Sequence, residues 1–113
     1  KPPKPARAGI AWVALNDRAI LLERRAPKGL LGGTLAFPST GWDGSDQPPP
    51  LPAAWRALDP VQHVFTHFSL NLRVQVAHLD GNPERGFWMP RAEFNAGDLP
   101  GLMRKVWTRV QAG

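Results

Sequence analysis

Polar and apolar residues alternate along the stretch from Val61 to Leu79, which carries the clearest pattern in the sequence. One parity is mostly apolar and consists of Val64, Thr66, Phe68, Leu70, Leu72, Val74 and Val76. The other is richer in polar residues and consists of His63, Phe65, His67, Ser69, Asn71, Arg73 and Gln75. A period of two is typical of β-strands. Because strands rarely exceed about 10 residues, the pattern predicts two strands joined by a turn among residues 66–69.

Shorter apolar runs bounded by turn-forming residues predict further strands. These strands are Gly9–Leu15, Ala19–Leu22, a short segment ending at Phe37-Pro38, and Gly86–Met89. The pair Asn16-Asp17 is expected to turn the first strand into the second. Glycines in Gly29–Thr34 predict a loop, since they permit positive φ or a close backbone approach.

Two predicted helices and one loop complete the pattern. Residues Ser39–Pro50 are expected to form a surface loop, because Trp42 is their one core-type residue. The segment Leu51–Leu58 predicts two helical turns that end before Pro60. A C-terminal amphipathic helix is expected after Pro100. Its apolar side would carry Leu102, Met103, Val106, Trp107 and Val110, and its outer side Arg104, Lys105 and Arg109.

Composition fits one small domain, which the predicted strands and helices would make an α+β domain. The 113 residues are 42% hydrophobic, enough for a single core. Because Lys1–Arg7 combine proline with positive charge, we expect residues 1–8 to be an inter-domain linker of a larger protein and residues 9–113 the domain. No apolar run approaches the length that crosses a membrane, so we expect a soluble domain with no membrane partner. We also expect a monomer.

Charge and residue usage narrow the chemistry. Lys and Arg outnumber Asp and Glu by 14 to 9, which favours a polyanionic partner, although a solvated basic surface is the alternative. The absence of cysteine excludes disulfides, iron–sulfur ligation and thiol nucleophiles in this chain, and it suits the cytosol. No two acidic residues lie at helical spacing on a predicted helix, so the sequence predicts no magnesium site. No nucleophile-elbow motif is present either. We therefore expect a domain without catalytic activity or metal.

The segment Gln62–Phe68 alternates aromatic rings with hydrogen-bonding groups at the predicted turn. Such a loop suits nucleic acid, because bases offer faces for stacking and polar edges for hydroxyl or imidazole groups. Alternatively, Phe65 and Phe68 fill the core and His63 makes a hydrogen bond within the sheet. The spacing of these residues alone favours neither interpretation.

Five segments, in order along the chain, form a more specific combination. They are Leu21–Arg25, Lys28–Gly33 continuing to Phe37-Pro38, His63–Phe68, Trp88–Pro90 and Leu99–Lys105. With these segments the sequence resembles the C-terminal domain of MutY-type adenine DNA glycosylases, which is similar in fold to the Nudix hydrolase MutT. The resemblance implies a Nudix-like mixed β-sheet flanked by helices. Active Nudix enzymes carry a glutamate-rich helix, whereas Leu51–Leu58 has no carboxylate.

The resemblance also implies a function in base excision repair. The family removes adenine opposite 8-oxoguanine, using a separate catalytic domain with an iron–sulfur cluster. Its C-terminal domain recognises the 8-oxoguanine through a Phe-Ser-His loop, which matches Phe65, Thr66 and His67 here, with threonine replacing serine. Lys28, Arg24 and Arg25 would support phosphate contacts.

The implied partners are duplex DNA with an 8-oxoguanine:adenine mispair and the protein's own catalytic domain, in a cytoplasmic, DNA-associated bacterial enzyme. A hydroxyl on Thr66 could accept from the N7 proton that distinguishes 8-oxoguanine from guanine. The extra methyl group would either fix the rotamer or crowd the base. Two alternatives remain: a protein-interaction module docking through Trp42, Trp55 or the proline-rich loop, and a divergent Nudix pyrophosphohydrolase.

Overall fold

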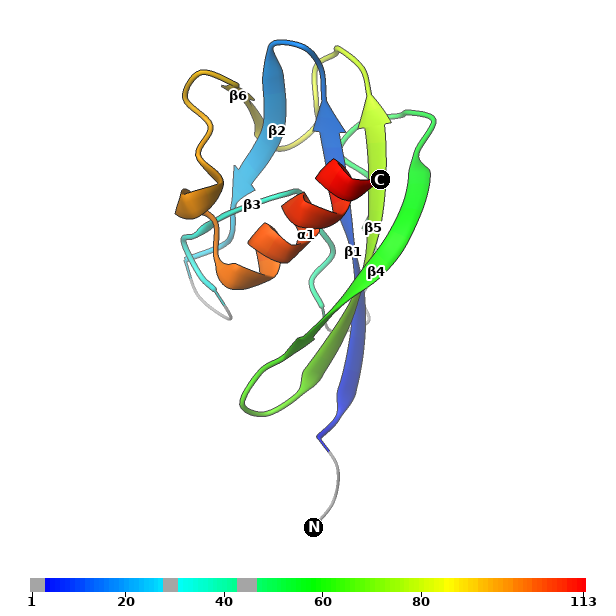
Figure 1. Cartoon of the computed structure of the whole chain (residues 1–113), viewed down its shortest axis with the longest axis vertical. Helices are drawn as coiled ribbons and strands as arrows, with labels where there is room; N and C mark the ends of the chain where they lie inside the picture. Colours follow the sequence, from blue (N-terminus) through cyan, green and yellow to red (C-terminus); the bar gives the residue numbers. More distant parts are fainter. Residues whose placement is uncertain (1–3, 28–30, 43–46) are drawn as a thin grey trace.

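The structure is a computed structural model that describes residues 4–27, 31–42 and 47–113. Within these ranges the chain forms a mixed six-stranded sheet, with a short 3-10 helix and an α-helix at its C-terminal end (Figure 1). The strands are β1 (Ala6–Leu15), β2 (Ala19–Arg24), β3 (Leu35–Ala36), β4 (Arg56–Val64), β5 (Ser69–His78) and β6 (Phe87–Pro90). The helices are η1 (Ala96–Asp98) and α1 (Gly101–Ala112). The expected α+β, Nudix-like mixed sheet is confirmed.

Strand order in the sheet is β3-β2-β1-β5-β4, with β6 paired to β2. The long ladder at the centre is parallel and joins β1 to β5, from Ala6 opposite Ser69 to Leu15 opposite His78. The predicted turn between β1 and β2 is confirmed, because the Asn16 side-chain oxygen accepts from the backbone N–H groups of residues 18 and 19. Strand β1 begins at Ala6, three residues before the predicted start.

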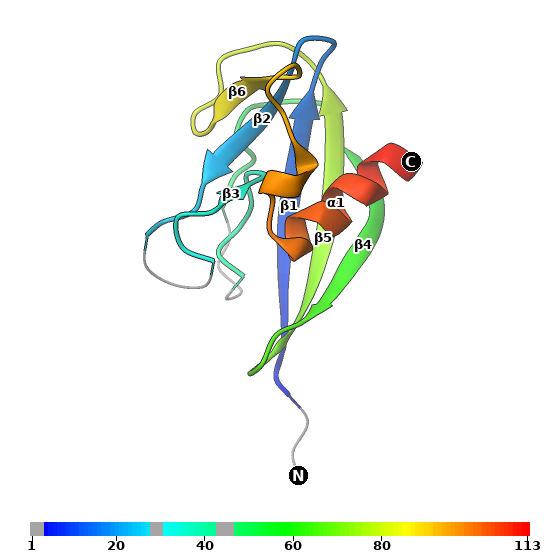
Figure 2. The same cartoon turned by 60° about the vertical axis from the view of Figure 1, so that its left-hand side comes forward.

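Alternation along the strands sends side chains to two faces of the sheet. One face carries the larger core, which α1 covers with Leu102, Met103 and Val106 (Figure 2). The other face carries a smaller cluster built on Ala14, Leu21 and Leu51. The predicted amphipathic C-terminal helix is therefore confirmed. No helix in the described ranges is both long and apolar enough to pass through a bilayer.

The helix expected at Leu51–Leu58 is wrong. Residues 51–55 have no regular structure, and β4 starts at Arg56 and pairs antiparallel with β5. Pro60 is tolerated because β4 is an edge strand and shifts register between Leu58 and Val61, where a missing N–H breaks no ladder bond. In the described part of the chain, one α-helix rather than several therefore flanks the sheet.

The surface loop expected at Ser39–Pro50 is wrong at both ends. Ser39, Thr40 and Trp42 are only 4%, 5% and 2% exposed, and Pro50 is also buried. The Thr40 hydroxyl accepts from the backbone N–H of Ile10, so the first part of this segment packs against β1. Trp42 is consequently a core residue.

Candidate nucleic-acid interface

The β4–β5 loop, residues 65–68, closes the hairpin at the predicted turn. Its ends are joined by a hydrogen bond of 2.8 Å from the Phe65 N–H to the Phe68 carbonyl. Thr66 and His67 are exposed at the tip, Phe65 is half-buried, and Phe68 is 7% exposed. The loop therefore presents its two polar side chains to solvent and holds its two phenyl rings against the protein.

An aromatic cluster of Trp42, His63, Phe65 and Phe68 supports this loop. The Phe65 ring lies at the centre of the cluster, with its centroid 4.8 Å from that of Phe68, 4.7 Å from His63 and 6.4 Å from Trp42. The packing of the phenyl rings agrees with the core interpretation of the motif, while Thr66 and His67 stay outside and their binding to nucleic acid stays a prediction. The ring contacts of Phe65 with its three neighbours hold the base of the loop in place.

Trp42 connects Arg25 to the aromatic cluster. The Arg25 guanidinium carbon lies 3.6 Å from the Trp42 ring centroid, and its Nη1 donates to the Ser39 hydroxyl at 3.2 Å. Burial lowers the pKa of Arg25 below its ordinary value, and the nearby Glu23 opposes this effect. Arg25 is therefore packed beside the loop's support, so its guanidinium is less accessible to a phosphate than the sequence suggested.

Glu23 lies near Arg25 and forms an ion pair with Arg85. The Glu23 Oε1 lies 3.4 Å from Arg85 Nε, and the two side chains are 19% and 28% exposed. Burial raises the pKa of Glu23, while the positive charges of Arg85 and Arg25 act in the opposite direction. In the described residues no group of three His, Cys, Asp or Glu side chains gathers into a potential metal site.

Of the other two predicted phosphate-binding residues, the described part of the chain includes Arg24. Arg24 is exposed and donates from Nη1 to the Gly33 carbonyl at 3.2 Å. Lys28 lies outside the described residues, so the structure does not place it. Of the two predicted cations within the described residues, Arg25 contacts the aromatic cluster, whereas Arg24 bonds to Gly33.

Three further cations surround the β4–β5 loop and were missed by sequence reasoning. Lys4 donates from Nζ to the Phe65 carbonyl at 2.9 Å, and the Arg7 guanidinium carbon lies 4.3 Å from the Phe68 ring centroid. Lys105 Nζ lies 2.9 Å from His63 Nδ1. These contacts join residues 42 to 61 positions apart, so no local pattern in the sequence predicts them. Their shared position makes the base of the loop electropositive.

His63 is a neutral acceptor in this arrangement. Because a lysine ammonium only donates, His63 Nδ1 must accept from Lys105. Burial, and secondly the positive charge of Lys105, lower the pKa of His63. His67 is exposed and has no hydrogen bond to any described residue, so the two histidines of the motif occupy different environments.

The structure shows the surroundings of the three surfaces considered for protein docking. Trp42 is buried, so docking through this residue is wrong. Trp55 is half-buried against the smaller core cluster. In the proline-rich loop, the Pro48 carbonyl accepts from Arg85 and the Pro50 carbonyl from the Glu84 N–H, which ties this segment to the following loop.

Comparison with known protein families matches residues 10–109 to the NUDIX domain. The chain belongs to the Nudix domain family. This Nudix domain is 33% identical over 114 residues to human adenine DNA glycosylase, an alignment that covers 83% of the chain and 21% of the human protein. The chain thus spans about a fifth of the length of that relative. The resemblance to adenine DNA glycosylases is confirmed.

Solved structures agree on the fold. The Nudix domain superposes on the C-terminal domain of mouse MUTYH, determined in complex with human PCNA, with a TM-score of 0.73 and 24% identity, covering 94% of this chain and 88% of that one. It superposes on a MutT Nudix hydrolase from Burkholderia pseudomallei with a TM-score of 0.71 and 18% identity, covering 95% and 99%. At these identities the similarity establishes the fold.

Proposed function

We propose that this Nudix domain is the lesion-recognition module of an adenine DNA glycosylase and reads 8-oxoguanine opposite adenine in duplex DNA. The observation that carries the proposal is the position of Thr66, which is exposed at the tip of a hairpin whose base is fixed by the aromatic cluster. A side chain that reads a base must be exposed so that it reaches the DNA, and its loop must be fixed so that its position is defined.

The chemistry of the tip suits the difference between the two bases. The Thr66 hydroxyl makes no hydrogen bond to a described residue, so its lone pairs are available to a ligand. In 8-oxoguanine N7 carries a proton, whereas in guanine N7 is an acceptor. A hydroxyl accepting from N7 would therefore favour the oxidised base. His67, exposed beside Thr66, would approach the backbone or the base edge.

The proposal assigns no hydrolysis to this domain. Residues Leu51–Leu58, where the resemblance to Nudix enzymes implies the glutamate-rich helix, form an irregular segment and the start of β4 and contain no carboxylate. Catalysis, and the iron–sulfur cluster that the resemblance implies, would belong to a separate domain. That domain and the mispaired DNA are the proposed partners of a monomeric, cytoplasmic bacterial enzyme.

The experiment compares duplexes carrying 8-oxoguanine or guanine opposite adenine, using the full-length glycosylase that the proposal predicts. Thr66→Ala should reduce the preference for the oxidised base by about 5- to 150-fold, the equivalent of about 1 to 3 kcal/mol for one good base contact. Thr66→Ser is the matched control and should keep the preference, because it retains the hydroxyl. If Thr66→Ala keeps the original preference, the assignment of the loop is wrong.

A further inference from the structure

A groove of about 670 Å³ runs between α1 and the edge strand β4. Its lining consists of Val61, Gln62, Gly101, Arg104, Lys105, Thr108 and Arg109. Three of these side chains are basic and none is acidic. The groove therefore combines a concave surface with a row of positive charge, which is the complement of a polyanion.

Two of the cations are held in place by the edge strand. Lys105 Nζ donates to the Gln62 carbonyl, and Arg109 Nη2 donates to the Pro60 carbonyl, both at 3.2 Å. One helical turn rises about 5.4 Å, and two strand residues span about 6.7 Å. Because these spacings are similar, Lys105 and Arg109, one turn apart on α1, each reach one of two alternate carbonyls of β4. Because these carbonyls are occupied, the groove is poorly suited to an added peptide strand, which would need them.

Arg104 is the cation left available for a ligand. It is exposed, and its guanidinium makes no hydrogen bond to any described residue. Its Nη2 lies over the first turn of α1, 3.7 Å from where a Cβ on Gly101 would stand. A guanidinium in this position has its full set of donors for a bidentate phosphate contact.

The groove is continuous with the β4–β5 loop. Lys105 contacts His63, and the His63 ring meets Phe65 edge-on at the base of the loop. His63 lies on β4, and Thr66 follows it by three residues at the tip of the loop, which limits their separation to about 11 Å along the chain. In both Figure 1 and Figure 2 the N-terminal end of α1, which carries Arg104, is the end nearer this loop.

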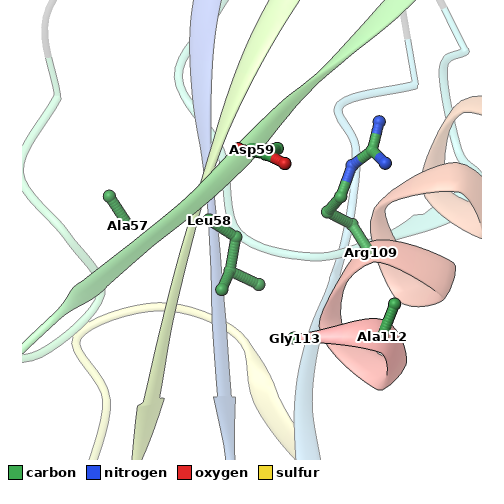
Figure 3. A pocket seen from close by; sticks show the side chains of 6 residues that line it. All are labelled: Ala57, Leu58, Asp59, Arg109, Ala112 and Gly113. Atoms are coloured by element: carbon green, nitrogen blue, oxygen red, sulfur yellow. The ribbon is translucent and has the colours of Figure 1, made fainter.

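At its other end the groove meets a carboxylate. A neighbouring pocket is lined by Ala57, Leu58, Asp59, Arg109, Ala112 and Gly113, and Figure 3 shows the Asp59 carboxylate and the Arg109 guanidinium facing the space between β4 and α1. Asp59 weakens the positive field beyond Arg109. The basic row is therefore limited to the part of α1 that leads toward Thr66.

We propose that the groove between α1 and β4 binds the phosphodiester backbone of DNA a few nucleotides from the base that Thr66 reads, with Arg104 as the direct phosphate ligand. This inference rests on the proposed function. Lys105 contacts His63, three residues before Thr66, so the cations of the groove begin within a few nucleotide steps of the reading hydroxyl. Phosphate contacts of this kind fix the register of a protein on DNA without adding sequence information.

The test measures binding of the full-length protein to both duplexes over a series of salt concentrations, for the original sequence and Arg104→Gln. Losing one phosphate contact should reduce the slope of log K against log salt by about 0.9 and weaken binding to the two duplexes by the same factor. Because Arg104 bonds to no described residue, the thermal midpoint should stay unchanged.

Arg18→Gln is the matched control. It removes the same charge from the turn between β1 and β2, at the opposite end of the sheet from the β4–β5 loop, where the side chain is 81% exposed (Figure 1). Its salt slope should equal that of the original protein. A slope that is unchanged by Arg104→Gln, or reduced equally by Arg18→Gln, overturns the proposal.

The two proposals fail in different ways. If Thr66→Ala removes the base preference while Arg104→Gln leaves the salt slope intact, the groove is not a DNA contact and the proposed function stands. If Arg104→Gln reduces the slope while Thr66→Ala keeps the preference, the groove binds DNA but Thr66 does not read the base. Binding of a polyglutamate peptide that Arg104→Gln abolishes, together with an unchanged salt slope on DNA, would assign the groove to an acidic protein instead.

Discussion

The Arg25 guanidinium stacks on the Trp42 ring, with its central carbon 3.6 Å from the ring centroid. The same indole faces Phe65, which supports the β4–β5 loop. A partly desolvated cation–π pair contributes about 2 kcal/mol. Trp42 therefore links a charge on the segment after β2 to a loop 40 residues further along the chain.

Trp42→Ala should lower the free energy of unfolding by about 3 to 5 kcal/mol, because it removes a fully buried ring and both of these contacts. Trp42→Phe should cost much less, since the buried indole N–H has no partner among the described residues and its loss removes an unsatisfied donor. Urea unfolding measures both values. Equal costs for the two variants would show that ring packing is not what Trp42 contributes.

Gly9→Ala should destabilise the protein by about 1 to 3 kcal/mol through overpacking. A Cβ at this position in β1 would lie 2.8 Å from both the Thr40 hydroxyl and Trp42 Cδ1. Gly101→Ala is the control, because a Cβ there makes an ordinary contact of 3.7 Å and alanine suits a helix better than glycine. Thermal unfolding of both variants checks the difference, and a Gly9→Ala protein as stable as the original would contradict the close packing.

Stability should fall as pH drops below 6.5, in part because of His63. Its pKa in the folded protein lies below the ordinary value of 6.5, so the unfolded chain binds the proton first. The contribution of neutral His63 is therefore complete above pH 6.5 and is lost as pH falls toward and through the folded pKa. Protonation also ends the hydrogen bond from Lys105.

Urea midpoints between pH 7.5 and pH 5 measure this dependence. His63→Gln should flatten the loss of stability across that interval. His67→Gln is the matched control, because it removes an exposed histidine without a hydrogen bond to the described residues. If both variants follow the same pH profile as the original protein, His63 does not contribute.

The domain should release neither phosphate nor pyrophosphate from 8-oxo-dGTP in the presence of magnesium. The reason is chemical, because hydrolysis of this kind needs several carboxylates around hard cations, and Leu51–Leu58 supplies none. Product release can be followed by ion-exchange chromatography, with an active Nudix hydrolase as the positive control. Magnesium-dependent release above the rate without protein would make the domain an enzyme.

The sequence predicted most elements well, and it predicted the segments Ser39–Pro50 and Leu51–Leu58 poorly, for physical reasons. The alternation from Val61 to Leu79 specifies two strands and a turn, since a one-residue slip would expose the whole apolar set. The apolar spacing after Pro100 specifies α1, because it places the apolar side chains on one face of a helix. The helical pattern of Leu51–Leu58 failed because Leu51 is buried in the smaller core cluster and β4 gains its bonds from β5. Leu51 packs with Ala14 and Leu21, and Arg56 pairs with Val76, so these partners lie beyond the range of a helical pattern.

Part of the candidate site was likewise predictable from the sequence, and part was decided by the tertiary structure. By itself the sequence determined the alternation, the basic excess and the motif Phe65-Thr66-His67, because these depend on residue type and local spacing. Only the tertiary structure decided that Trp42 is buried beneath this motif and that Lys105 reaches it from α1. Those contacts join segments that the parallel β1–β5 pairing and the packing of α1 bring together, and no local pattern encodes such long-range geometry.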